Sequence, residues 1–551
     1  MYFYLCLLCC ICGLRIAAAA VVLDATGRLN LSATCPDTFC SLTEKAVAYS
    51  DSPAVRLREL HISNCSREAV PWVVLNLTPG LRTLVIRNCG PYSIRKESLL
   101  PVRNLTSILM QRTKMWALRT DQFSVLPNLE ILELGHNVLY QVNSDAFNGL
   151  TKLKLLGLQG NALEEIRENT FDPLVELVHL DLSGNLIEKL PKDIFAKNTK
   201  LETLLLNGNH LTTLLSDTLM PLTNLRLLDL GHAGQLDNLM LNIVSVQTLI
   251  LEGSSLTDLI IHGGFIRLQA SNNELSHLHV GNKSSVIEMN LHGNLLNGND
   301  TYNLLRGMWS LERLDLSKNI IESLAFNEFY SEGQDLYLLP SLKYLNLANN
   351  RLVSLPSDSP ILSSRLTFLD LSHNLLLTLD VEKLAGLPNV ESLFLEGNRL
   401  STFDYKKFHS KHETLKELAL HDNHWSPGLY RIMFTYLNDR GVHLQSRIEN
   451  KAQITSSQVD IDWPPKEASA QKLDAAGVTG IHPYWTLRDI LAFTTLLVVL
   501  AILLMNLYHI LEEEGCLRRF RRWRRSTVPG GNARTSTRRL NEQDSENSSS
   551  D

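Results

Sequence analysis

The sequence predicts an α/β solenoid, a fold in which short units stack along one axis, and a repeated pattern of leucines carries this prediction. The pattern spans nine residues, with leucine at positions 1, 4 and 6 and asparagine at position 9. Four clean copies follow one another at intervals of 24 residues: LEILELGHN, LKLLGLQGN, LVHLDLSGN and LETLLLNGN. A fixed period of about 20–29 residues with this signature indicates a leucine-rich-repeat solenoid.

Weaker copies extend the pattern in both directions and bring the count to about 16 repeats. Their first residues are Leu57, Leu81, Leu105, Leu129, Leu153, Leu177, Leu201, Leu225, Val246, Phe265, Val286, Leu311, Leu342, Leu366, Val390 and Leu415. Side chains of a strand alternate between its two faces, so the leucines should face the core and positions 3, 5 and 7 should face out. The stacked strands should form a curved parallel sheet, and the function should lie on its free surface.

Two further positions of the repeat have structural roles. The asparagine at position 9 can satisfy backbone groups of adjacent turns that a buried bend would otherwise leave without partners. An aromatic spine should pack the outer side, because a phenylalanine recurs at a fixed offset and is replaced once, by Leu219. Its members are Phe123, Phe147, Phe171 and Phe195. The 24-residue form with this phenylalanine is typical of extracellular repeat proteins.

The spacing of the repeats is not uniform. It shrinks to 21, 19 and 21 residues at Val246, Phe265 and Val286, and it stretches to 31 before Leu342. Short repeats leave little outer connection, so we expect the curvature to change there. The pattern is open to two interpretations: drift in a tolerant scaffold, or a designed bend or binding loop.

Both ends of the chain carry topological signals. Residues 1–20 have an apolar stretch followed by three alanines, which predicts a secretory signal peptide, with retention as an anchor as the alternative. From Ile490 to Leu511 the chain has 22 residues without a charge, long enough to cross a bilayer. Six arginines follow this stretch, and the positive-inside rule places them in the cytoplasm. The alternative for this stretch is a buried helix of a soluble domain.

These signals predict a single-pass type I protein of the plasma membrane with an extracellular N-terminus. The closing sequence HDNHWSPGLYRIMFTYLNDRGVHL indicates a capping helix, because a terminal repeat would otherwise expose its apolar face. The predicted segments are a signal peptide (1–20), an N-terminal cap (21–56), leucine-rich repeats (57–425), a cap helix (426–444), a juxtamembrane stalk (445–486), a transmembrane helix (487–511) and a short basic cytoplasmic tail (512–551).

Four cysteines fall in the predicted extracellular part and are candidates for disulfides: Cys35, Cys40, Cys65 and Cys89. Cys65 and Cys89 both occupy position 9, in consecutive repeats. Adjacent strands lie about 4.8 Å apart, which is within the Cα separation that a disulfide tolerates. The alternative is that both thiols replace the turn asparagine and stay reduced. Cys35 and Cys40 could pair with each other or crosswise.

Other sequence signals concern covalent modification. Six sequons outside the membrane indicate a glycoprotein: Asn30, Asn64, Asn76, Asn104, Asn282 and Asn299. Cys516, just inside the predicted membrane helix, is a palmitoylation candidate, with a free cytosolic thiol as the alternative. Ser526 follows a run of arginines and is a phosphorylation candidate. The same arginines would bind anionic lipid in either case.

Position 5 of the repeats gives the candidate partner-binding residues. Apolar side chains stand there at Val85, Leu109, Leu205, Ile250 and Phe394, and exposed apolar residues on a concave sheet could anchor a protein partner. Asp181, Asp229, Asp315 and Asp370 occupy the same position in other repeats. They could form an acidic track for a basic partner, or they could reflect LDLSxN as a common form of the repeat.

The sequence shows no catalytic constellation, phosphate-binding loop, or cluster of cysteines or histidines at metal spacing. We therefore expect no enzyme, no cofactor and no metal site. Without its tail the chain is mildly acidic, which gives no indication of nucleic-acid binding.

The motifs LDLSGN, LDLSKN and LDLSHN, the short central repeats and the closing LHDNHWSPGLYRIMFTYLNDRGV resemble those of insect leucine-rich-repeat immune proteins. The resemblance covers roughly residues 57–443. The family's pattern normally has cysteine where Ser426-Pro427 stands, then further cysteines and a coiled coil. This chain instead has an apolar span, so the resemblance implies a membrane-anchored relative. It puts the family's disulfide-linked dimers and its soluble carriage of partners in doubt.

The function expected from the sequence is cell-surface recognition through protein–protein contact, in innate immunity. The short tail suggests that a protein ligand or co-receptor completes signalling. The alternative is a cell-adhesion or guidance protein of neuronal or epithelial cells. The sequence leaves the ligand and the oligomeric state open.

Overall fold

The computed structural model describes the backbone of residues 20–23 and 29–32, and residues 58–63, 75, 79–89, 94–324, 338–355, 361–384 and 386–444. All of them belong to the first of two compact units, which spans Met1–Gln453. The predicted stalk, transmembrane helix and tail lie outside the described residues. Within the described part of the chain, no helix combines the length and the apolar character needed to cross a membrane.

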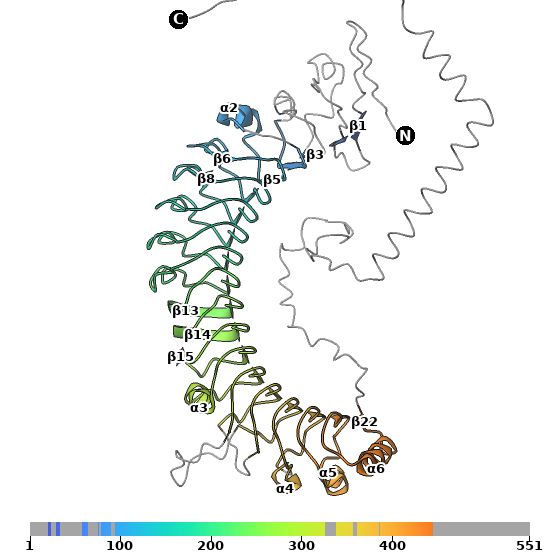
Figure 1. The fold of residues 1–551 in the computed structure, drawn as a ribbon. Helices are drawn as coiled ribbons and strands as arrows, with labels where there is room; N and C mark the ends of the chain where they lie inside the picture. The colour runs from blue at the N-terminus through green and yellow to red at the C-terminus, as the bar shows by residue number, and fades with distance from the viewer. Residues whose placement is uncertain are drawn as a thin grey trace, which may run out of the picture. The chain divides into compact units, whose positions relative to one another are not determined.

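The main element is a 20-stranded sheet in which all strand pairs are parallel, apart from the antiparallel pair β1–β2 (Figure 1). Its strands are β1 (Ala20–Leu23), β2 (Leu29–Ser32), β3 (Glu59–Ser63), β4 (Thr83–Arg87), β5 (Ser107–Gln111), β7 (Ile131–Glu133), β9 (Leu155–Gly157), β10 (His179–Asp181), β11 (Thr203–Leu205), β12 (Leu227–Asp229), β13 (Asn238–Ile250), β14 (Asp258–Gln269), β15 (His277–Asn282), β16 (Glu288–Asn290), β17 (Arg313–Asp315), β18 (Tyr344–Asn346), β19 (Phe368–Asp370), β20 (Ser392–Phe394), β21 (Glu417–Ala419) and β22 (His443–Leu444). A small pair, β6 (Ala117–Leu118) and β8 (Gln141–Val142), lies beside it.

The described residues form a β-solenoid of about 14 turns with a parallel sheet. A strand lies within each of the sixteen predicted repeats. The solenoid has fewer turns than the predicted number of repeats, and the reason differs between its two ends. The first repeat is described only in part, because residues 64–74 lie outside the described ranges. The repeat that begins at Leu415 continues into a cap helix rather than into another full turn.

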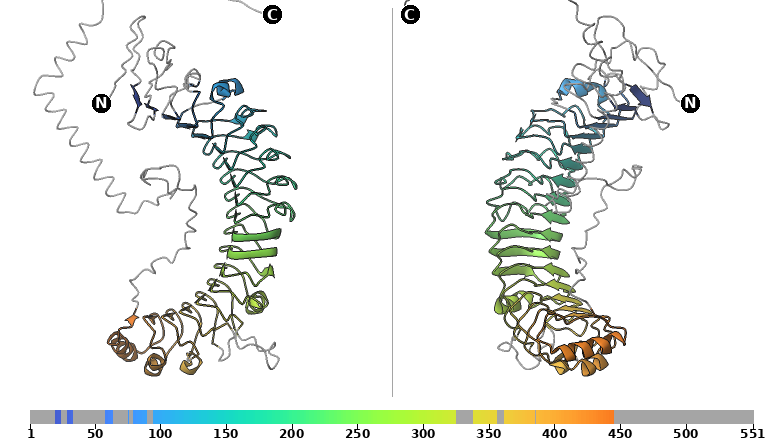
Figure 2. Two further views of the ribbon diagram at one scale, coloured as in Figure 1. Left: turned by 180° about the vertical axis from the view of Figure 1, so that it is seen from behind. Right: turned by 45° about the vertical axis from the view of Figure 1, so that its right-hand side comes forward.

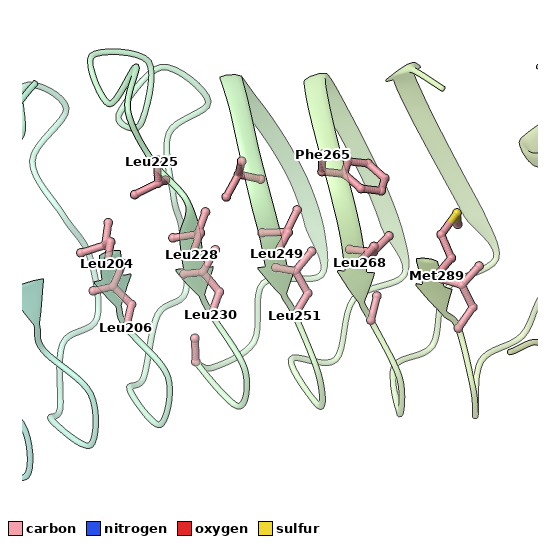
Figure 3. Packing of buried hydrophobic residues seen from close by; sticks show 14 of the residues in the cluster. Leu204, Leu206, Leu225, Leu228, Leu230, Leu249, Leu251, Phe265, Leu268 and Met289 are labelled. Carbon is pink, nitrogen blue, oxygen red and sulfur yellow. The ribbon is translucent and has the colours of Figure 1, made fainter. Parts of the chain in front are cut away.

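The repeat leucines form one continuous core along the solenoid. Positions 4 and 6 are buried in every repeat from Leu129 to Leu225, and position 1 closes the core beside them. Figure 3 shows these side chains stacked in rows from strand to strand, with Leu204, Leu228, Leu249, Leu268 and Met289 in one row. Each repeat therefore buries its apolar residues against its neighbours, as a solenoid requires.

The phenylalanine spine lies buried on the outer side. Phe123, Phe147, Phe171 and Phe195 have no exposed surface, and Leu219 takes the same place with 1%. The ring centroids of Phe147 and Phe171 are 6.2 Å apart, and those of Phe171 and Phe195 are 6.1 Å apart. These offset stacks fill the space between turns where no strand pairing holds the chain.

The asparagine at position 9 joins consecutive turns, as its chemistry predicts. Asn185 donates from Nδ2 to the carbonyl oxygens of Leu158 (3.0 Å) and Leu182 (2.9 Å), and its Oδ1 accepts from the backbone N–H of Leu163 (3.2 Å). The same arrangement recurs at Asn137, Asn161, Asn209, Asn273, Asn294, Asn319, Asn350, Asn374, Asn398 and Asn423. One side chain thus satisfies backbone groups of two turns.

The short central repeats replace the outer connection with strands. In β13 and β14 the chain is extended on the outer flank and continues into the concave sheet, with an irregular register between Asn242 and Ser245. The flanking part of β14 pairs with β15, whereas its concave part pairs with β16. Figure 2 shows these long green strands side by side. This outer sheet was not predicted from the sequence.

Helices occupy the outer side elsewhere: α2 (Lys96–Leu99), the 3₁₀ turn η3 (Leu100–Val102), α3 (Gly298–Leu305), α4 (Val381–Leu384) and α5 (Tyr405–Lys411). Figure 1 shows the array nearly straight through β13–β15 and more strongly curved beyond α3. Strands keep a spacing of about 4.8 Å on both sides, whereas a helix about 10 Å across spreads the outer side. The short repeats therefore change the curvature.

The C-terminal end of the solenoid is covered by α6 (Pro427–Asn438), which lies within the predicted cap segment 426–444. Ser426 caps the helix by accepting a hydrogen bond from the backbone N–H of Leu429. Met433 and Leu437 are buried, and the indole N–H of Trp425 donates to the carbonyl oxygen of Leu420 at 2.6 Å. The helix thus shields the last repeat from water.

Candidate binding surface on the concave sheet

The position-5 side chains form one row along the concave sheet. The strand register pairs them from repeat to repeat, in the order His61, Val85, Leu109, Glu133, Gly157, Asp181, Leu205, Asp229, Ile250, Gln269, Asn290, Asp315, Asn346, Asp370, Phe394 and Ala419. All five apolar candidates and the four aspartates therefore share this row. Among the apolar candidates only Val85 and Leu109 lie on adjacent strands, and no two of the aspartates do.

Exposure separates the five apolar candidates into two groups. Leu109, Leu205 and Ile250 are half-buried and reach the concave surface. Val85 is only 7% exposed and Phe394 only 4%, so the expectation of exposed side chains is wrong for these two. Phe394 is covered in part by Phe368 of the preceding repeat, whose ring centroid lies 5.2 Å away. An outward direction on a strand does not ensure exposure when the neighbouring strand carries a large side chain.

The four aspartates have a local structural role. Each accepts a hydrogen bond from the backbone N–H two residues later, at Ser183, Gly231, Ser317 and Ser372, and each distance is 2.9 Å. Asn290 and Asn346 make the same contact to His292 and Ala348. A carboxylate is therefore not required at this position. This observation favours the interpretation of LDLSxN as a form of the repeat over a dedicated acidic track.

Two carboxylates in the N-terminal half are nevertheless perturbed by burial. Burial raises the pKa of Glu133 above its ordinary value, although hydrogen bonds from the backbone of Gly135 and from Gln159 oppose this change. Burial likewise raises the pKa of Asp229, and the negative charge of Asp181 adds to the effect in both cases. Gly157 leaves room for Glu133, because a Cβ there would lie 2.2 Å from Oε2 of Glu133.

The densest cluster of large side chains on the concave face lies in the C-terminal half, mostly at position 3. Tyr344 of β18 stacks on Phe368 of β19 with ring centroids 4.2 Å apart, and Phe368 in turn contacts Phe394 of β20. The guanidinium carbon of Arg313 on β17 lies 4.3 Å from the centroid of the Tyr344 ring. We call Arg313, Tyr344, Phe368 and Phe394 the aromatic platform.

A carboxylate holds the arginine end of the platform in place. Glu288 on β16 pairs with Arg313 (3.8 Å) and with Arg267 of β14 (3.4 Å), and the Glu288 side chain is only 16% exposed. Burial raises the pKa of Tyr344 to about 12, and the nearby charge of Asp315 adds to this effect, so its phenol stays neutral. The platform thus offers two half-buried rings beside a partly exposed guanidinium group.

Large aromatic side chains and arginine are the residues that most often dominate binding energy at protein interfaces. The stacked rings are held before any partner arrives, which lowers the entropy cost of binding. Sequence reasoning found Phe394 but missed Arg313, Tyr344 and Phe368. Alignment of the repeats by position 3 would have shown these three in consecutive repeats, whereas position 5 by itself reveals Phe394 alone.

The remaining predicted site residues are only partly described. Asn104, Asn282 and Asn299 are exposed. In the Asn299 sequon, Thr301 is buried and donates its hydroxyl hydrogen to the carbonyl oxygen of Asn297 at 2.7 Å. Asn30 is described by its backbone alone, on β2. Asn64, Asn76, Cys516 and Ser526 lie outside the described residues, and these modifications stay predictions.

Cys89 is buried and bonded in a disulfide. Cys35, Cys40 and Cys65 lie outside the described residues, so the pairing of Cys65 with Cys89 stays a prediction. The parallel register of β3 and β4 joins residues that are 24 apart, such as Glu59 and Thr83. The same interval separates Cys65 from Cys89 in the sequence.

Comparison with known proteins identifies the repeat. The family model described as leucine rich repeat matches residues 103–163, 139–187, 175–233 and 340–400. These segments carry leucine-rich repeats. They include nine of the twenty strands of the sheet, β5, β7, β9–β12 and β18–β20, and the platform residues Tyr344, Phe368 and Phe394 lie within the last segment.

Curated leucine-rich-repeat proteins resemble this chain over part of their length. Human oligodendrocyte-myelin glycoprotein is 30% identical over 190 residues, which cover 34% of this chain and 38% of that protein. Bovine lumican is 30% identical over 187 residues, which cover 29% of this chain and 52% of lumican. The match thus spans about half or less of each relative. It does not establish that this chain shares the activity of either protein.

Solved structures share the fold. A leucine-rich-repeat protein of Leptospira interrogans has a TM-score of 0.55 and 21% identity, covering 75% of this chain and 100% of that one. The LRIM1/APL1C complex has a TM-score of 0.50 and 21% identity, and the match covers 85% of this chain and 76% of that one. The Drosophila Toll–Spätzle complex has a TM-score of 0.55 and 20% identity, and the match covers 67% of this chain and 51% of that one. At these identities the likeness shows the leucine-rich-repeat fold alone.

Within the described residues, no group of histidines, cysteines and carboxylates could hold a metal ion. The concave surface offers rings, a guanidinium group and half-buried aliphatic side chains.

Proposed function

We propose that this leucine-rich-repeat protein is a cell-surface recognition protein that binds a protein partner through its concave sheet. The aromatic platform is the observation that carries the proposal. Its rings combine apolar area with a fixed geometry, and Arg313 adds a planar group that can bind a carboxylate of the partner. The half-buried Leu205 and Ile250 extend the apolar contact toward the N-terminal half.

We further propose that recognition serves innate immunity and that a co-receptor completes signalling. Two of the structures with this fold are complexes of leucine-rich-repeat proteins with protein partners, LRIM1 with APL1C and Toll with Spätzle, and the Toll–Spätzle complex is a hub of Drosophila development and innate immunity. The apolar stretch 490–511 and the arginines after it support a single-pass anchor in the plasma membrane. Exposed Asn282 and Asn299 leave room for glycans.

A role in cell adhesion or guidance is the second candidate. It is favoured by the 30% identity over 190 residues to human oligodendrocyte-myelin glycoprotein. The two candidates differ in where the protein should be made. Infection-induced expression in blood cells or gut supports the immune role, and expression in developing nervous tissue supports adhesion.

The test uses the full chain displayed on cells, with proximity labelling and identification of the proteins that bind. Two platform variants, Tyr344→Asp and Phe368→Asp, should each weaken capture of the partner by about tenfold or more. The control is Tyr140→Asp, because Tyr140 stacks on Trp116 with ring centroids 5.9 Å apart and is 51% exposed, but is not part of the concave sheet. Equal capture by the platform variants and the control would show that the platform is not the binding site.

A further inference from the structure

The position-2 side chains follow a regular pattern of charge along the edge of the concave sheet. In four places a glutamate at this position pairs with the base at the same position of the next repeat. The pairs are Glu130–Lys154 (2.8 Å), Glu202–Arg226 (3.3 Å), Glu312–Lys343 (3.0 Å) and Glu391–Lys416 (2.8 Å). Every base at position 2 from Lys154 onward is therefore balanced by a carboxylate on the neighbouring strand.

The first two repeats break this pattern. Arg58 and Arg82 occupy position 2 on adjacent strands, and the backbone N–H of Arg82 donates to the carbonyl oxygen of Arg58 at 2.8 Å. Within the described part of the chain, neither guanidinium group has a carboxylate in ion-pair distance. Like charges opposite each other on neighbouring strands destabilise a sheet. An anion that binds both groups would remove this repulsion.

The two arginines line a hollow of about 760 Å³. The other residues that line it are Gly80, Asn104, Thr106, Asn128, Glu130 and Lys152. Glu130 is already neutralised by Lys154, and the ammonium group of Lys152 donates to the side-chain oxygen of Asn128 at 2.8 Å rather than to a carboxylate. The hollow therefore carries an excess of positive charge, in a chain whose formal net charge is −6.

We propose that this hollow binds an extended acidic segment of a partner protein. The planar guanidinium groups of Arg58 and Arg82 suit bidentate contacts with carboxylates. The side-chain amide of Asn128 can donate a hydrogen bond to peptide backbone. Three cations and one paired carboxylate match a ligand with two or three negative charges better than a highly sulfated sugar polymer. The site lies on the repeats of β3–β7, apart from the aromatic platform on β17–β20, and does not depend on it.

The test uses the purified full-length chain in detergent micelles and a fluorescein-labelled peptide of alternating glutamate and glycine, followed by fluorescence anisotropy. The double variant Arg58→Gln/Arg82→Gln should bind this peptide about tenfold or more weakly. The matched control is Arg226→Gln/Lys343→Gln, which removes the same charge from paired positions and should change the affinity less than about twofold. The double variant Arg58→Lys/Arg82→Lys keeps the positive charges but lacks the planar guanidinium groups that bind carboxylates bidentately. It should lose an intermediate amount of affinity for the peptide.

The control also separates a specific site from general electrostatic attraction. Equal weakening by the two glutamine double variants, or no weakening by either, would overturn the proposal. Heparin is the competing probe. Binding of heparin through Arg58 and Arg82 without measurable binding of the acidic peptide would assign the hollow to a sulfated polysaccharide and refute the peptide proposal. Because both arginines are exposed, the thermal unfolding midpoint of Arg58→Lys/Arg82→Lys should stay close to that of the unchanged chain, and that of Arg58→Gln/Arg82→Gln should stay close to it or rise slightly as the repulsion is removed.

Discussion

Position 8 of the repeat lies in a turn whose backbone conformation restricts which residue types fit. Positive φ angles occur there in successive repeats, for example at His136 (+55°), Gly160 (+61°), His232 (+50°), Gly253 (+62°) and His373 (+53°). Glycine adopts this conformation without a steric cost. Each of the three histidines at this position packs over the glycine that follows one repeat later. The histidines at this position are therefore explained by turn packing.

Gly397 is the sharpest test of this arrangement. Its φ is +67°, and a Cβ would lie 2.3 Å from Nδ1 of His373. Gly397→Ala should lower the free energy of unfolding by about 1–2 kcal/mol from the backbone alone, and the clash should add to this. The control Gly428→Ala, in helix α6 with nothing within 4 Å of its Cβ, should be neutral or stabilising by up to about 1 kcal/mol. Urea denaturation measures both, and equal effects would refute the account.

Glu133 gives a prediction about pH. Burial raises its folded-state pKa above 4.5. The folded state therefore binds the Glu133 proton more tightly than the unfolded state does. The stability that this proton contributes is fully present below pH 4.5 and is lost as the pH rises through the folded-state pKa. The ionised carboxylate is therefore unfavourable in the folded state at neutral pH. Glu133→Gln should raise the free energy of unfolding at pH 7, and the gain should disappear below about pH 4.5. Denaturant titrations over this range test the sign.

The exposed Glu164 provides the control for that experiment, since Glu164→Gln should change stability by less than about 0.5 kcal/mol at pH 7. A loss of stability in Glu133→Gln at neutral pH would mean that the hydrogen bonds from Gly135 and Gln159 outweigh the cost of burying the charge.

At the level of single residues, the sequence predicted only part of the candidate binding surface. Alternation along the strand placed Leu205, Ile250 and Phe394 on the concave side. It could not show that Phe394 is buried, because its exposure depends on Phe368 of the neighbouring repeat. Nor could it show the stacking of Tyr344, which follows an insertion that lengthens the preceding repeat to 31 residues. Contacts across the sheet are set by register, and register is a property of the folded array.

Among the elements, the concave strands were predictable and the outer strands of the central repeats were not. Apolar residues at positions 4 and 6, most of them leucines, mark every concave strand. In Asn238–Ile250 the outer part also alternates, with Leu239, Leu241 and Ile243 buried. This pattern of period two was visible in the sequence, but the repeat motif begins only at Val246. The shortened spacing was therefore interpreted as a loss of connection rather than as a strand.

The asparagine ladder holds these elements together, and Asn185 tests its contribution. Asn185→Ala removes three donated bonds and one accepted bond in a buried turn. The carbonyl oxygens of Leu158 and Leu182 keep the side-chain amides of Asn161 and Asn209 as donors, whereas the backbone N–H of Leu163 loses its acceptor. A buried backbone group left without a partner costs about 1–3 kcal/mol, so a loss in this range is expected. Asn224 is exposed and donates one bond, to Thr199, at 2.8 Å. Asn224→Ala should cost under about 1 kcal/mol, and similar losses in thermal unfolding would contradict the special role of position 9.

At the scale of the whole molecule, each repeat of a solenoid contacts only the repeats beside it. The two terminal repeats would therefore expose an apolar face to water unless a cap covers them. Helix α6 supplies this at the C-terminal end by burying Met433 and Leu437. The described residues end shortly after it, at residue 444. How the solenoid is attached to the cell is therefore a prediction from the sequence alone, carried by residues 487–511 and by the arginines that follow.

That prediction places the solenoid outside the cell and the arginines inside. Moving arginines across a bilayer is costly, and the positive-inside rule reflects this cost. An antibody to an epitope inserted after Arg525 should therefore stain only permeabilised cells. An epitope inserted beside the exposed Gly428 of the cap helix should be stained on intact cells. If intact cells show the epitope after Arg525, the orientation is reversed. If they show neither epitope, the chain is not at the surface, and a partner for the concave sheet must be sought inside the cell.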